Sequence, residues 1–128
     1  MKFEISQEEI NEFLKEKFQV KVEINEGKLN ISAMMGTVKF TLFAPKTPVE
    51  FAKEIEMKIS MSLTVRMFLD RIKDELKKRN LNEAISITPN LLKIDITKME
   101  NKPVINWLKG KTLKEMKLEN EKMYLEIA

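Results

Sequence analysis

The sequence predicts an α+β fold in which a long, curved antiparallel sheet carries two amphipathic helices packed on one face. The main observation is the run over residues 54–66, in which apolar and polar residues alternate at each of thirteen positions. Side chains of a strand point to opposite faces in turn, so this run predicts a strand with one buried and one exposed face. At about 3.3 Å per residue it would measure roughly 43 Å, which requires a long or curved sheet. Shorter alternating runs joined by turns favour antiparallel pairing.

The first helix is predicted over residues 7–18. Ser6 and Glu9 have the spacing of a capping box, and Ile5 and Ile10 that of a hydrophobic staple. A stripe of apolar residues then recurs at helical spacing. The stripe consists of Ile10, Phe13, Leu14 and Phe18.

Three strands are expected between this helix and the long strand. Residues 19–25 alternate, residues 26–28 suit a turn, and residues 29–34 form the return strand of a hairpin. Alternation resumes over 38–42, and the prolines within 45–48 indicate a loop or a sheet edge.

A second helix is expected directly after the long strand. Basic residues gather at its end, as the helix dipole favours, and Asn80 suits a left-handed C-cap. Strands are then expected at 85–87 and 92–96, joined by a turn at 88–91. The apolar face of this helix consists of Met67, Phe68, Leu69, Ile72 and Leu76.

The C-terminal part begins with an apolar cluster flanked by lysines, over residues 102–111. One interpretation is a short helix that folds Trp107 back over the core. The other is a loop that contacts a membrane or a partner. The candidate contact residues are Val104, Ile105, Trp107 and Leu108. Residues 113–118 and 123–127 are expected to form a terminal hairpin.

Composition restricts the function classes. The 128 residues suit a single domain, 1–128, and 43% hydrophobic with 34% charged residues indicates a folded chain. The net charge of +3 is too small to predict a nucleic-acid partner. No long apolar segment or export signal is visible, so we expect a cytoplasmic location unless an anchor has been removed.

The residue inventory argues against an enzyme. The chain has no histidine and no cysteine, which removes the commonest general base, the commonest metal ligand and thiolate chemistry. We therefore expect no catalytic residue, no metal site and no cofactor.

Two pairs of carboxylates are the remaining candidates for chemistry. Asp70 and Asp74 share a helix face that could present them to a cation, and Glu54 with Glu56 could serve acid-base work. An exposed, ion-paired helix face and a solvated strand face are the preferred interpretations.

The chain contains nine methionines, most of them at inward-facing positions such as Met34, Met35 and Met57. Adaptable apolar binding surfaces use methionine often, although the residue also fills gaps in ordinary cores. The candidate ligand-binding residues are Ile55, Met57, Ile59, Met61, Leu63 and Met67.

Three segments together resemble a known family. They are Ile-Ser-Gln-Glu-Glu-Ile-Asn-Glu-Phe-Leu, then Val-Glu-Ile-Asn-Glu-Gly-Lys-Leu-Asn-Ile, and finally Ile-Ser-Ile-Thr-Pro-Asn-Leu-Leu-Lys-Ile-Asp-Ile, with the long strand and second helix between the last two. The order resembles, over residues 5–98, small bacterial envelope proteins of uncharacterised function related to tubular lipid-binding domains. The resemblance implies a long curved sheet that wraps a helix around an apolar groove.

The leading hypothesis is therefore a non-enzymatic domain that binds a lipid or other elongated apolar ligand between sheet and helices, with Trp107 touching a membrane. The alternative is a protein-interaction or assembly module with a cystatin-like helix-on-sheet fold and no small-molecule ligand.

Overall fold

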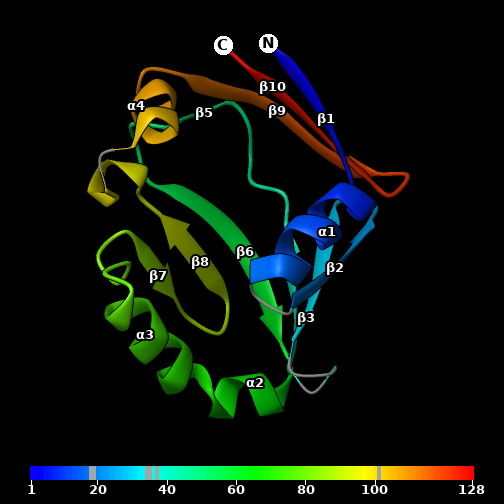
Figure 1. The fold of residues 1–128 in the computed structure, drawn as a ribbon, viewed down its shortest axis with the longest axis vertical. Helices are drawn as coiled ribbons and strands as arrows, with labels where there is room; N and C mark the ends of the chain where they lie inside the picture. The colour runs from blue at the N-terminus through cyan, green and yellow to red at the C-terminus, as the bar shows by residue number, and fades with distance from the viewer. Residues whose placement is uncertain (18–19, 34–35, 37, 101) are drawn as a thin grey trace.

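The computed structural model describes residues 1–17, 20–33, 36, 38–100 and 102–128. It confirms the α+β class, with helices and antiparallel strands (Figure 1). The strands are β1 (Lys2–Ser6), β2 (Val20–Asn25), β3 (Lys28–Ala33), β4 (Val38–Phe43), β5 (Val49–Glu50), β6 (Ile55–Met61), β7 (Ile85–Ile87), β8 (Leu91–Ile94), β9 (Thr112–Glu119) and β10 (Lys122–Ile127). The helices are α1 (Gln7–Lys17), α2 (Leu63–Met67), α3 (Leu69–Lys78), α4 (Pro103–Lys109) and the short 3₁₀ turn η1 (Ile96–Lys98).

The larger sheet has six strands in the order β2-β3-β4-β6-β8-β7, each antiparallel to its neighbour. The predicted hairpin at residues 26–28 is confirmed, because β2 and β3 pair from Asn25 and Lys28 outward. Gly27 lies between them with φ of +71°, a left-handed conformation that glycine adopts without steric cost. The turn also docks on the second sheet, since the Gly27 N–H donates to the Leu118 carbonyl at 2.7 Å.

The second sheet has four strands in the order β1-β10-β9-β5 and crosses the upper part of the molecule in Figure 1. The predicted terminal hairpin is confirmed as β9 and β10. Asn120 and Glu121 form its two-residue turn, with φ of 53° and 58°, as a type I′ turn requires. β1 was not predicted, although Phe3 and Ile5 alternate with polar residues.

The first helix begins as the sequence predicts. The Glu9 N–H donates to Ser6 Oγ at 3.1 Å, and the Ser6 N–H donates to Glu9 Oε1 at 3.3 Å. The capping box is thus complete, and α1 follows β1 without a linker. Phe18 of the expected stripe, and the candidates Met34 and Met35, lie outside the described residues.

The thirteen-residue strand expected over 54–66 is wrong. β6 ends at Met61, and Ser62 caps α2 by accepting a hydrogen bond from the Val65 N–H at 3.3 Å. Leu63 is 73% exposed whereas Val65 is 0% exposed, so two residues that alternation places on one face differ completely in burial. Apolar residues at a spacing of two occur both in a strand and in the first turn of a helix, so this spacing does not distinguish the two. Ser62 favours the helix, because its side chain caps the helix N-terminus.

The expected second helix is present but interrupted. α2 and α3 meet at Phe68, whose φ and ψ of −99° and 7° break the helix. Met67 is 76% exposed and does not lie on the buried face expected for it. Asn80 is confirmed in the left-handed conformation, with φ of 58°. The helix closes as a Schellman motif, with the Leu81 N–H donating to the Leu76 carbonyl at 2.8 Å.

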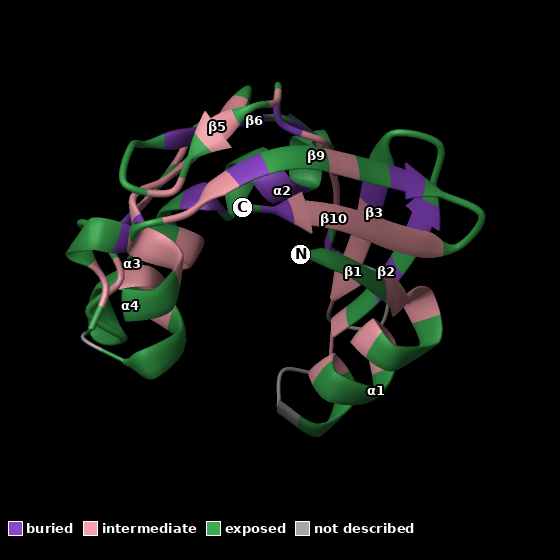
Figure 2. Cartoon of the chain, turned by 90° about the horizontal axis from the view of Figure 1, so that it is seen from above, coloured by how far each residue is buried: buried purple, intermediate pink, exposed green. Residues whose placement is uncertain are grey.

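The arrangement is more open than one sheet with two helices on a face. Viewed from above, α1 lies at one side of the molecule and α3 with α4 at the other, with strands of both sheets between them (Figure 2). The core draws on both sheets and on α2 and α3. Its buried side chains are Val22, Ile24, Leu29, Val38, Leu42, Ile55, Met57, Ile59, Met61, Val65, Leu69 and Leu118.

Candidate functional site

The candidate site is the apolar face of the six-stranded sheet, called here the inner face. Four of the six predicted ligand residues alternate along β6 and are buried on it, namely Ile55, Met57, Ile59 and Met61. The other two, Leu63 and Met67, lie outside this face on α2. The structure therefore brings four candidates together and separates two.

Strand register extends the inner face on both sides of β6. Ile31 pairs with Phe40, and Phe40 pairs with Met61, so these three side chains form one row across β3, β4 and β6. A second row runs from Met57 through Leu92 to Ile87, across β6, β8 and β7. Directly opposed residues of an antiparallel pair share a face. The two rows thus make one apolar surface across five neighbouring strands.

Burial changes along these rows. Met57 and Met61 are buried at the centre, whereas Ile31, Phe40 and Leu92 are only half-buried. Half-buried apolar side chains from α1 and α3 also pack against this core, among them Leu14 and Ile72. Figure 2 shows the same mixture of buried and intermediate residues along the strands and helices. The side chains of the inner face are therefore buried at its centre and only partly buried toward its sides.

Helix α1 is held beside the inner face by side-chain amides. Asn11 Nδ2 donates to the Val22 carbonyl at 2.8 Å, and the Val22 N–H donates to Asn11 Oδ1 at 2.6 Å. The Ile24 N–H donates to Gln7 Oε1 at 2.7 Å. These bonds replace the missing neighbour of edge strand β2 and fix the helix against the sheet.

The chain exposes an unusually large surface for its mass. Its accessible surface is 8944 Å², whereas a compact protein of 15.0 kDa exposes about 7,000 Å². Val65 is the sole described side chain of large volume that is less than 2% exposed. The excess of surface and the half-buried apolar rows describe an open fold.

The buried part of the inner face is apolar in the described residues. Among the described residues, no polar or charged side chain is buried, and no buried side-chain nitrogen or oxygen lacks a hydrogen bond. Within the same residues, no group of three or more aspartates and glutamates is placed to hold a metal ion. This surface can therefore contribute contact area and shape.

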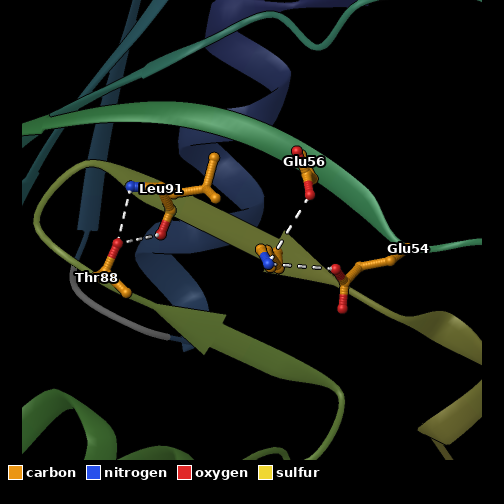
Figure 3. A network of polar contacts seen from close by, with 5 residues as sticks. Glu54, Glu56, Thr88 and Leu91 are labelled. Atoms are coloured by element: carbon orange, nitrogen blue, oxygen red, sulfur yellow. Dashed lines mark hydrogen bonds and ion pairs between the residues drawn. The ribbon is translucent and has the colours of Figure 1, made fainter.

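The two glutamates considered for catalysis lie at the start of β6, on its polar side. Lys93 Nζ lies 3.7 Å from Glu54 Oε1 and 3.9 Å from Glu56 Oε1, so one lysine from β8 bridges both carboxylates (Figure 3). Both glutamate side chains are exposed, and the Lys93 side chain is partly exposed. The solvated strand face preferred from the sequence describes this arrangement. The ion pairs with Lys93 are exposed, and such pairs contribute little stability.

The other carboxylate pair, Asp70 and Asp74, is exposed on α3. An ion pair on the same helix joins Lys78 Nζ to Glu75 Oε1 at 3.5 Å. The helix surface is thus a charged, solvated one.

The apolar cluster at residues 102–111 forms helix α4, which confirms the helix of the first interpretation, but α4 has no buried residue and Trp107 is not part of the core. Trp107 is 38% exposed, and Lys111 Nζ lies 5.5 Å from the centre of its ring. Val104 is exposed, whereas Ile105 and Leu108 are half-buried. The membrane or partner contact through these residues stays a prediction.

The opposite face of the same sheet is polar. It forms a shallow hollow of about 550 Å³ lined by polar residues such as Lys21, Ser32, Lys39 and Thr41, together with Ile31, Phe40 and Met61 of the first apolar row. Thr41 Oγ1 donates to Asn30 Oδ1 at 2.8 Å across two strands. A surface of this composition does not suit an acyl chain, which leaves the inner face as the apolar candidate.

Asp95 is the N-cap of η1, and its pKa is lowered. Its carboxylate accepts hydrogen bonds from the hydroxyl and the N–H of Thr97, and these bonds, with Lys98 nearby, lower the pKa of Asp95. A second perturbed group is Lys122, whose pKa is raised by its ion pair with Glu4 at 2.7 Å.

Sequence reasoning missed Ile31, Phe40, Leu92, Ile87 and Ile72 as members of the site. Strand alternation identifies the first four as inward-facing. What the sequence lacks is the register, which places them in rows with the methionines of β6.

No family model, curated protein or solved structure was found to match this chain. In the part of the chain that the structure describes, the helices are all too short or too polar to cross a membrane.

Proposed function

We propose that this chain is a non-enzymatic binding domain that holds an elongated apolar ligand, such as a long acyl chain, against the inner face. The observation that carries the proposal is the pair of apolar rows, buried at Met57 and Met61 and half-buried at Ile31, Phe40 and Leu92. The excess of accessible surface supports it. The absence of buried charge among the described residues suits a ligand without polar groups along its length.

The dimensions and energetics are compatible with such a ligand. Five neighbouring strands span about 19 Å at their usual spacing. Each CH₂ group removed from water contributes about 0.8 kcal/mol, so burying eight of them contributes about 6 kcal/mol before the costs of ordering. Before those costs are subtracted, that energy corresponds to a dissociation constant on the order of tens of micromolar.

Titration with cis-parinaric acid, a fluorescent polyene fatty acid, tests the proposal. Saturable fluorescence enhancement is expected for the native chain. Ile31→Gln places an amide in the apolar row and should weaken binding about fivefold, the equivalent of roughly 1 kcal/mol.

Ser32→Gln is the matched control, because Ser32 is the next residue of β3, is also half-buried, and faces the opposite side of the sheet. Its affinity should stay within twofold of the native value. Circular dichroism of both variants establishes that each is folded. A lack of saturable binding, or equal weakening by both substitutions, would rule out the inner face as the binding surface.

A protein-interaction or assembly module is the second candidate, favoured by a different observation. Leu63 and Met67 lie one helical turn apart on α2 and are the two most exposed large apolar side chains described. Exposed apolar clusters often mark contact surfaces. Light scattering of Leu63→Ser/Met67→Ser beside the native chain tests this candidate, with a lower mass of the variant expected if α2 mediates assembly.

A further inference from the structure

The four edges of the two sheets are protected unequally. β2 is covered by the side-chain amides of Asn11 and Gln7. β5 and β7, at two other edges, contain two and three residues. Short or covered edges resist pairing with other chains, whereas longer open edges invite it. β1 has five residues and is the longest edge strand that is not covered in this way. Charged and apolar residues alternate over Lys2–Ile5, and Ser6 ends the strand.

The hydrogen bonds of β1 define which backbone groups are free. Met1 and Ile127 exchange two hydrogen bonds, of 2.7 and 2.8 Å. Hydrogen-bonded pairs alternate along an antiparallel ladder, so Phe3 and Ile5 direct their N–H and C=O groups toward β10. Lys2 and Glu4 direct theirs outward, where the described residues supply no partner.

The side chains of this edge complement themselves. We propose that β1 pairs antiparallel with β1 of a second copy of this chain, around a two-fold axis at Phe3. Lys2 then lies opposite Glu4 of the second copy, and Glu4 opposite its Lys2. Each of these pairs exchanges two backbone hydrogen bonds and joins opposite charges across the strands.

The other side of the strand is equally self-complementary. Phe3 lies opposite Phe3 of the second copy, and Met1 lies opposite Ile5. Phe3 is 37% exposed in the single chain, so pairing removes apolar surface from water. The ion pair of Glu4 with Lys122 leaves the second carboxylate oxygen of Glu4 available to Lys2 of the second copy. The same register thus satisfies backbone, charge and apolar contacts, as an isologous interface requires.

Sedimentation velocity of the full chain over a range of concentrations tests the pairing. A single strand pair is smaller than the usual interface of about 800 Å² per partner, so a dissociation constant on the order of 10–100 μM is expected. Lys2→Glu and Glu4→Lys should each raise it at least tenfold, because each variant places like charges opposite each other.

Two combinations should restore association. An equimolar mixture of Lys2→Glu and Glu4→Lys chains should form a mixed dimer, and the double variant Lys2→Glu/Glu4→Lys should dimerise with itself. A native chain that remains monomeric over the whole range, or a dimer indifferent to the single charge reversals, would overturn the proposal.

Covalent trapping gives a second readout. The chain has no cysteine, so Phe3→Cys introduces one thiol at the axis, where opposed Cα atoms about 4.5 Å apart permit a disulfide. Mild oxidation should yield a covalent dimer. Lys53→Cys, exposed beyond the opposite edge strand β5, should not do so under the same conditions. Equal cross-linking of both variants would contradict the assigned axis.

The pairing is independent of the apolar ligand, and it uses β1 and not the exposed apolar side chains of α2. Titration of the Lys2→Glu chain with cis-parinaric acid separates the two proposals. A native chain that stays monomeric while fatty-acid binding is intact removes the strand pairing alone, and a native dimer that binds no fatty acid removes the ligand proposal alone.

Discussion

Replacing Asn11 by alanine removes the amide that mimics a neighbouring strand for β2. The variant loses two hydrogen bonds to Val22, of 2.8 and 2.6 Å, each contributing about 1 kcal/mol. Alanine is a better helix former than asparagine by about 0.6 kcal/mol, which offsets part of the loss. The expected decrease in the free energy of unfolding is therefore about 1.4 kcal/mol.

Urea denaturation followed by circular dichroism measures this change. With a slope of about 2 kcal/mol per molar urea, the midpoint should fall by about 0.7 M. Glu12→Ala, at the next and exposed position of α1, is the control and should shift the midpoint by less than about 0.25 M. An Asn11→Ala midpoint equal to that of Glu12→Ala would refute the view that the amide pair fastens α1 to β2.

Three further predictions concern the capped segments and the core. Val65→Ala removes the one large side chain that is fully buried among the described residues and should lower stability by about 2 kcal/mol in urea denaturation, whereas Leu63→Ala should change it by less than about 0.5 kcal/mol. Ser62→Ala removes the N-cap of α2 and should cost about 1 kcal/mol in the same assay, with an unchanged midpoint arguing against the cap. The lowered pKa of Asp95 stabilises the fold above its unfolded pKa near 3.8, and this contribution is lost as pH falls through the folded value. The urea midpoint of the native chain should therefore drop below pH 3.8 more than that of Asp95→Asn, and parallel pH profiles would contradict the role of the Thr97 bonds.

Local signals in the sequence were strong enough to predict several elements. The capping box at Ser6 and Glu9, the hairpin at Gly27 and the left-handed Asn80 each depend on residues within a few positions of one another. Chemistry at that range is nearly independent of the rest of the fold, and the structure confirms all three.

The length of the central strand could not be predicted in the same way. Met61, Leu63 and Val65 continue the alternation of β6, but Ser62 offers a hydroxyl to a helix N-terminus, and the helix forms. Whether residues 62–66 extend the strand or form the helix depends on tertiary packing, which buries Val65 completely and leaves Leu63 exposed to water. Likewise, alternation predicts that Ile31 and Leu92 face inward but not that they align with Met61 and Met57, because register depends on pairing between distant segments.

Paramagnetic relaxation from stearic acid that carries a nitroxide near its methyl end reports directly whether an acyl chain lies on the inner face. With the methyl groups of isoleucine and leucine labelled, we expect the signals of Ile31, Ile87 and Leu92 on the inner face to broaden as the fatty acid is added, while the signal of Leu63 on α2 keeps its intensity. Broadening confined to Leu63, or no broadening at concentrations well above tens of micromolar, would contradict binding of an acyl chain to the inner face of the six-stranded sheet.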